Sequence, residues 1–117
     1  MLKEELIYIS GPITADTKRE EQRNLDRFVD AGVELTDLGH TVILPGENLG
    51  RVGKEANWNY RTYMRHDLAL LKVSETVYFL QGWKKSRGSR IEHRYARLLK
   101  KGIIYEPFKD KGSSSLD

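Results

Sequence analysis

A loop of small and basic residues at positions 82–89 separates an apolar run, residues 76–80, from an amphipathic stretch, and Glu92 follows the loop. An apolar strand, a Ser/Gly loop and a helix start commonly hold an anion, because the first N–H groups of a helix have no partner within it. A carboxylate beside a bound phosphate repels it, so Glu92 is a poor choice for binding alone. Its position fits chemistry on something attached to the phosphate.

Glu92 also has a purely structural interpretation. Ser89-x-x-Glu92 has the spacing of a capping box, in which the glutamate only accepts the backbone N–H of Ser89. Ser86 and Gly88 favour the functional interpretation, because small residues let phosphate oxygens approach the backbone. A Ser-x-Gly pair is a weak signal by itself, so both interpretations stay open at this point.

Asp67 is the second candidate carboxylate. It lies in a predicted helix at 58–72, where it is either an ordinary surface acid or a neighbour of the apolar stripe formed by Met64, Leu68 and Leu71. A half-buried aspartate needs a partner or a task at the rim of a site. The second interpretation would place two carboxylates in one crevice.

The strands and helices that must position these residues alternate along the chain. Thr17 and Gly39 have the residue types that begin and end a first helix. A polar loop rich in Gly and Asn is expected at 47–57. The predicted strands are 6–9, 40–44, 75–80 and 103–105, and the predicted helices are 17–38, 58–72 and 89–101.

This βαβαβαβ order, with nearly all-apolar strands, predicts a parallel sheet covered on both faces. We therefore expect an α/β fold: a single small, doubly wound domain with a parallel four- to five-stranded sheet of the flavodoxin or Rossmann type. Ligands bind such sheets beyond the carboxyl ends of the strands. That rule brings Ser10, Gly11, the turn at 45–46 and the loop at 82–89 to one rim, with Glu92 facing the same crevice.

Composition narrows the classes of protein to consider. The 117 residues suit one domain, expected at 1–109, with a disordered tail at 110–117. There is no cysteine, which excludes a thiolate nucleophile and Cys-ligated zinc, and the three histidines lack metal-like spacing. The apolar runs are too short to span a membrane, so we expect a soluble, cytoplasmic protein with no membrane partner, no metal and no cofactor. Ten Lys/Arg against three acids at 84–111 suit an anionic ligand.

Three motifs together resemble the nucleoside 2-deoxyribosyltransferase-like superfamily over residues 5–106. They are Tyr8-Ile9-Ser10-Gly11-Pro12, Asp67, and Gly82-Trp83-x-x-Ser86-x-Gly88-x-x-x-Glu92-x-x-x-Ala96. More narrowly, the chain is similar to a small phage-associated domain of unknown function within that superfamily, and to the 2'-deoxynucleoside 5'-monophosphate N-glycosidases. A phage source would place the protein in the host cytoplasm.

The resemblance implies a role for each matching residue. Glu92 would be the nucleophile that attacks the anomeric carbon of the sugar. Asp67 would orient the sugar or assist protonation of the leaving base. Tyr8, Ser10 and Gly11 would line the pocket for base and sugar.

The resemblance also implies a phosphate-binding set. Ser86, Gly88 and Ser89 would receive the 5'-phosphate, with Arg19 or Arg90 as charge partners. Many relatives carry Gly or Ala where this chain has Arg90, and Arg19 aligns only approximately with the phosphate-loop arginines of the family. The C-terminal segment that longer transferases borrow from a neighbouring subunit has no clear equivalent here.

The function that the resemblance implies is cleavage or transfer of the N-glycosidic bond of a nucleoside or its 5'-monophosphate, and it also implies a homo-oligomer of two or more chains. The sequence leaves hydrolase and transferase open. One alternative is a binding module that sequesters a nucleotide without turnover. A second is a nucleic-acid-binding protein that uses the basic segment 84–101, but no aromatic platform is evident between the basic residues, and Trp83 could equally cover the core.

Overall fold

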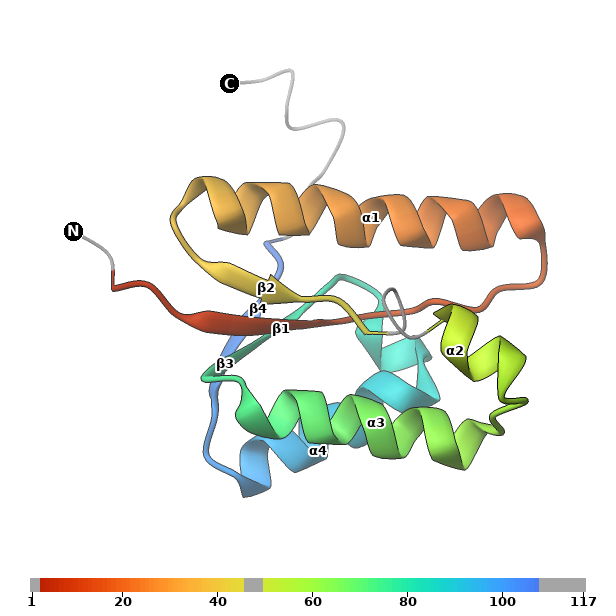
Figure 1. The fold of residues 1–117 in the computed structure, drawn as a ribbon. Coiled ribbons are helices and arrows are strands. Elements are labelled where there is room, and N and C mark those ends of the chain that lie inside the picture. The colour runs from red at the N-terminus through yellow and green to blue at the C-terminus, as the bar shows by residue number, and fades with distance from the viewer. Residues whose placement is uncertain (1–2, 46–49, 108–117) are drawn as a thin grey trace, which may run out of the picture.

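Four parallel strands form the sheet of this protein, and helices cover both of its faces (Figure 1). The computed structural model describes residues 3–45 and 50–107. In chain order the elements are β1 (Leu6–Ser10), α1 (Lys18–Asp37), β2 (Thr41–Ile43), α2 (Gly50–Glu55), α3 (Tyr60–Val73), β3 (Thr76–Phe79), a 3-10 turn η1 (Trp83–Lys85), α4 (Arg87–Leu98) and β4 (Gly102–Tyr105).

The strand order is β2-β1-β3-β4, so the chain changes direction across the sheet between β1 and β3. After β1 the chain crosses through α1 to β2 on one side, then returns through α2 and α3 to β3 on the other. This order is that of flavodoxin-like sheets, and the predicted doubly wound α/β fold is confirmed. Ligands in such folds bind at the carboxyl ends of the two strands where the order reverses, here β1 and β3.

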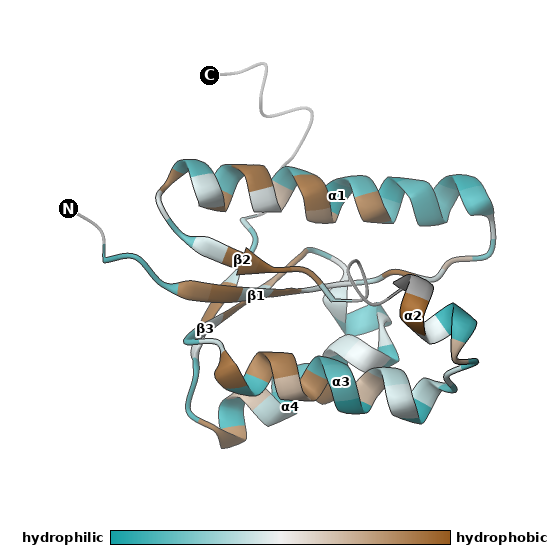
Figure 2. Cartoon of the chain, viewed as in Figure 1, coloured by the Kyte–Doolittle hydropathy of each residue, from teal (hydrophilic) through white to brown (hydrophobic). Residues whose placement is uncertain are grey.

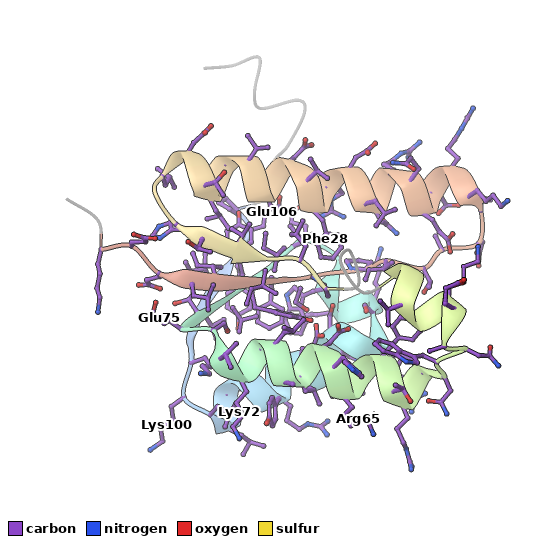
Figure 3. The ribbon with its side chains drawn as sticks, in the orientation of Figure 1. Phe28, Arg65, Lys72, Glu75, Lys100 and Glu106 are labelled. Atoms are coloured by element: carbon purple, nitrogen blue, oxygen red, sulfur yellow. The ribbon has the colours of Figure 1, made fainter. Side chains whose placement is uncertain are left out.

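Alternation along β1 decides which residues face which helix layer. Ile7 and Ile9 pack in the core beneath α1, together with Phe28, whereas Tyr8 packs in the opposite core against α3 and α4. Ser10 has the same parity as Tyr8 and lies on the same side. Figure 2 shows brown stretches in β1 and β2, and Figure 3 shows Phe28 between α1 and the sheet.

The first helix begins and ends as predicted. Thr17 caps α1 by accepting the N–H of Glu20 at 3.1 Å, and Gly39 follows the helix with a φ of 98°, a left-handed conformation that glycine tolerates. Phe28, Ala31 and Leu35 of this helix are buried, whereas Leu38, just past its end, is exposed. The helix ends at Asp37, so Leu38 no longer turns towards the sheet.

Several boundaries differ from the sequence-based expectation: α3 begins at Tyr60 rather than at position 58, and α4 ends at Leu98 rather than at position 101. The loop predicted at 47–57 contains α2, a six-residue helix whose Gly content hid it. Helix α4 begins at Arg87 rather than at Ser89, because Ser86 is its N-cap. The predicted tail at 110–117 and Gly46 lie outside the described residues. No helix in residues 3–45 and 50–107 is both long and apolar enough to cross a bilayer.

Candidate functional site

The candidate site is built around Glu92, which is buried in α4 with 4% of its surface exposed. Its Oε2 accepts the phenolic O–H of Tyr8 at 2.7 Å, and its Oε1 accepts the hydroxyl of Ser10 at 2.6 Å. The two donors come from successive positions on one face of β1. The carboxylate is therefore fixed at both oxygens by the strand that ends at the switch point of the sheet.

A second serine extends this network. The hydroxyls of Ser89 and Ser10 lie 3.0 Å apart, and both side chains are buried. A hydroxyl has one proton to give, so Ser89 donates to Ser10 when Ser10 donates to Glu92. Ser89 and Glu92 stand three residues apart on α4, which puts them on the same face of the helix. Ala96, one turn further, is small enough to let α4 lie close to the sheet.

Burial dominates the electrostatics of Glu92. Loss of solvation raises the pKa of this carboxyl from 4.5 to about 7, against the opposing effect of the hydrogen bonds from Ser10 and Tyr8, and the charge of Asp67 raises it further. Burial, followed by repulsion from Glu92, also raises the pKa of Tyr8, so the phenol stays protonated and remains a donor. Near neutral pH, Glu92 can exist with or without its proton.

Asp67, on α3, interacts electrostatically with Glu92 and Tyr8. Burial raises the pKa of this carboxyl to about 6, and the charge of neighbouring His66 acts in the opposite direction. Asp67 also acts on the pKa of both Tyr8 and Glu92. Of the two interpretations of Asp67, the structure shows the half-buried position beside the apolar stripe. The structure thus brings two carboxyls with raised pKa values to the same end of the sheet.

The capping-box interpretation of Glu92 is wrong. The N–H of Ser89 is donated to Oγ of Ser86 at 3.2 Å, while both oxygens of Glu92 are bonded to β1. The helix starts three residues earlier than that interpretation requires, because Ser86 and not Ser89 is the N-cap, so Glu92 lies in its second turn. Glu92 consequently has no role in capping α4, and its burial must be explained in another way.

Each predicted phosphate-binding residue of this loop, Ser86, Gly88 and Ser89, already has a structural role. Ser86 caps α4, and Ser89 is committed to Ser10 through its hydroxyl. Gly88 packs closely on α3: an added Cβ would lie 3.3 Å from Sδ of Met64 and 3.6 Å from the hydroxyl of Tyr60. Close helix packing is therefore a sufficient reason for glycine here, and the phosphate contacts stay a prediction.

Three other predicted residues do not contact Glu92. Gly11 lies just beyond β1, where a Cβ would approach atoms of Leu80 to 2.8 Å, so packing alone requires a glycine there. Arg19 is exposed at the start of α1. Arg90 is also exposed and donates from Nη1 to the carbonyl oxygen of Lys84 at 2.8 Å.

Met64 of α3, which lies beside the site, was missed as a functional candidate. Tyr60 and Met64 meet the start of α4 at Gly88, and the guanidinium of Arg87 lies 5.1 Å from the ring of Tyr60. Tyr60, Met64 and Asp67 are spaced by four and three residues, which is the spacing of one helix face. That signal in the sequence could have shown that Asp67 points towards α4. Within the described residues, no group of three His, Asp or Glu side chains is arranged to hold a metal.

One comparison with known proteins gives a match. The family model described as "Domain of unknown function (DUF4406)" matches residues 5–105, a segment that contains all the site residues described above. Among curated proteins, none matches the chain.

Proposed function

The chain belongs to the family described as Domain of unknown function (DUF4406), and from the geometry of its buried glutamate we propose that it cleaves an N-glycosidic bond. The substrate class is a nucleoside, deoxynucleoside or 5'-monophosphate, and Glu92 is the nucleophile. The observation that carries the proposal is a buried carboxylate, held by two hydroxyl donors, at the switch point of a doubly wound sheet.

The hydrogen-bond partners of Glu92 favour a catalytic role for it over a purely stabilising one. A glutamate buried for stability is normally paired with a cation. Glu92 is bonded instead to two neutral hydroxyls, and a second carboxyl, Asp67, repels it. Such an arrangement makes the ionised form costly, which is typical of groups tuned for proton transfer or nucleophilic attack.

The proposed reaction follows the logic of retaining glycosidases. As the bond between the anomeric carbon and the base nitrogen breaks, its electron pair leaves with the base, and positive charge develops on the sugar. An oxygen of Glu92 captures the anomeric carbon as a glycosyl ester. Attack by water releases the free sugar and regenerates the carboxyl group, whereas attack by the nitrogen of another base gives transfer.

Asp67 and the start of α4 complete the proposed mechanism. Asp67, with a pKa of about 6, can hold the proton that the leaving base needs near neutral pH. A 5'-phosphate at the loop containing Ser86 and Gly88 would anchor the substrate away from the reacting bond. Binding energy from that remote group would fix the sugar over Glu92.

The test is a direct assay of base release. The protein is incubated with each nucleoside and its 5'-monophosphate, in ribo and deoxy forms, and free base is quantified by chromatography, with Glu92→Gln run beside it and Glu55→Gln as a control for an exposed glutamate. We expect release by the wild type and by Glu55→Gln, and a loss of at least about a hundredfold in Glu92→Gln. Added acceptor base distinguishes transfer from hydrolysis.

Two results would overturn the proposal. Release by Glu92→Gln at the wild-type rate would remove the glutamate from the mechanism. Silence over the whole panel, with and without acceptor base, combined with ligand-induced thermal stabilisation of both proteins, would instead indicate a nucleotide-binding module that performs no turnover.

A further inference from the structure

A second feature lies on the outer side of α4, away from Glu92. It is a hollow of about 650 Å³, lined by Trp83, Lys84, Arg90, His93, Arg94, Arg97 and Leu98. We call it the α4 groove. Glu92 and Ser89 do not line it, because they lie on the buried face of the same helix. The groove is therefore distinct from the site proposed above.

The charge of the α4 groove is uncompensated. Arg90, Arg94 and Arg97 are spaced by four and three residues, so they lie on one face of α4 over about 10 Å of its length. None of the described residues that line the groove is an acid. In residues 3–45 and 50–107, one ion pair is present, between Arg27 and Glu106 at 3.2 Å. Arg90, Arg94 and Arg97 therefore have no acidic partner among these residues. A row of unpaired guanidinium groups suits a ligand with several phosphates.

An aromatic surface forms the other wall. The rings of Trp83 and His93 stack at 4.3 Å with an interplanar angle of 27°, and Phe79 packs against Trp83 with ring centroids 5.1 Å apart. Burial, together with repulsion from Arg97 and Lys84, lowers the pKa of His93, which keeps the imidazole neutral and part of the stack. The platform that the sequence did not reveal is thus assembled from η1 and α4.

The side chain of Lys84 sits over this platform. Its Nζ lies 5.8 Å from the centroid of the Trp83 ring, and the side chain is exposed. Cation–π contacts at exposed positions are weak, so a stacking ligand can displace the ammonium group. Once displaced, the ammonium leaves this face of the Trp83 ring open to a base.

We propose that the α4 groove binds single-stranded nucleic acid, with a base stacked on Trp83 and consecutive phosphates along Arg90, Arg94 and Arg97. Stacking platforms beside basic grooves are the general means of holding single strands. A duplex keeps its bases inside its own stack and cannot use Trp83. A mononucleotide can use the ring but only one of the cations.

The experiment measures binding of a fluorescein-labelled twelve-nucleotide oligothymidylate by anisotropy over a range of salt concentrations. Neutralisation of three phosphates predicts a slope of about −2 in log K against log salt. The double variant Arg94→Gln/Arg97→Gln should bind at least about tenfold more weakly, with a slope reduced to about −0.7. Arg65→Gln/Lys72→Gln removes the same charge from exposed positions of α3 (Figure 3) and should bind like the wild type.

An abasic oligomer of the same length tests stacking without changing the protein. It retains the phosphates but loses the base on Trp83, so its affinity should fall between about 5- and 150-fold. Trp83→Phe, which keeps a ring in the stack, should show a smaller loss. Glu92→Gln should leave oligonucleotide binding unchanged, which separates this groove from the site proposed for base release.

Several outcomes would overturn the proposal. Equal losses of oligonucleotide affinity in the groove variant and the α3 control would show that binding depends on net charge alone. An abasic strand or a duplex that binds as tightly as the thymidylate strand would exclude stacking on Trp83. Displacement of the oligomer by equimolar thymidine monophosphate would identify a mononucleotide site instead.

Discussion

Replacing Glu92 by glutamine should make the folded protein more stable at alkaline pH while abolishing the proposed reaction. Burial raises the pKa of this carboxyl from 4.5 to about 7. Between these two pH values the folded protein holds a proton that the unfolded chain has released. The free energy of unfolding of the wild type therefore falls as the pH rises through this interval, and levels off above pH 7.

The size of the effect follows from the two pKa values. One pKa unit corresponds to ~1.4 kcal/mol, so the ionised Glu92 lowers the stability of the wild type by about 3 kcal/mol above pH 7. Glutamine resembles the protonated carboxyl in shape and has no charge to desolvate. The hydroxyls of Tyr8 and Ser10 can each rotate to donate or to accept, so both can remain bonded to it.

The assay is thermal and urea unfolding of wild type and Glu92→Gln from pH 4 to pH 9. At pH 4 the two midpoints should coincide. By pH 8 the variant should be more stable by about 3 kcal/mol, or about 10 °C in midpoint temperature for a domain of this size. Glu55→Gln, an exposed change in α2, gives the baseline for the loss of one carboxylate. A variant that is less stable at pH 8, or a difference that does not vary with pH, would refute the reasoning.

Three further changes test two residues that act on Glu92 and the close packing at the end of β1. Tyr8→Phe removes a hydrogen bond that favours the ionised carboxyl, so the pKa of Glu92 should rise further, by about one unit, and the acidic limb of the pH–rate profile should move upward with it. Asp67→Asn removes a negative charge, so the same limb should move downward while kcat falls by about a hundredfold or more. Gly11→Ala forces a Cβ against Leu80 and should reduce the free energy of unfolding by about 1–3 kcal/mol in urea titrations, with the remaining folded protein still active.

The fold could be predicted because each signal for it is local. Apolar strands, capping residues such as Thr17, and the glycine after α1 all act over a few residues, and the structure places them as expected. The first residue of α4 was harder to predict, since Ser86 and Ser89 are both good N-caps. The choice depends on η1, which ends at Lys85 and packs Trp83 against Phe79, a contact that no local pattern shows.

The site could be predicted only in part, because its decisive contacts join distant segments. The bonds from Tyr8 and Ser10 to Glu92 span 84 and 82 residues. Strand alternation puts the two donors on one face, and helical spacing puts Ser89 and Glu92 on another. Which faces meet depends on the order β2-β1-β3-β4, which the sequence pattern alone does not specify.

The different roles of Glu92 and Asp67 depend on the groups that surround each carboxyl as well as on their pKa values. Glu92, with a pKa of about 7, and Asp67, with a pKa of about 6, interact, so the pair holds about one proton between them at roughly pH 6.5. In the free protein that proton favours Glu92. In the proposed reaction, positive charge grows on the sugar beside Glu92, and the hydroxyls of Tyr8 and Ser10 already point at both of its oxygens. These donors stabilise the anion, so the proton moves to Asp67 or to the leaving base. A buried glutamate with hydroxyl donors and no cation is therefore suited to becoming charged only when a substrate requires it.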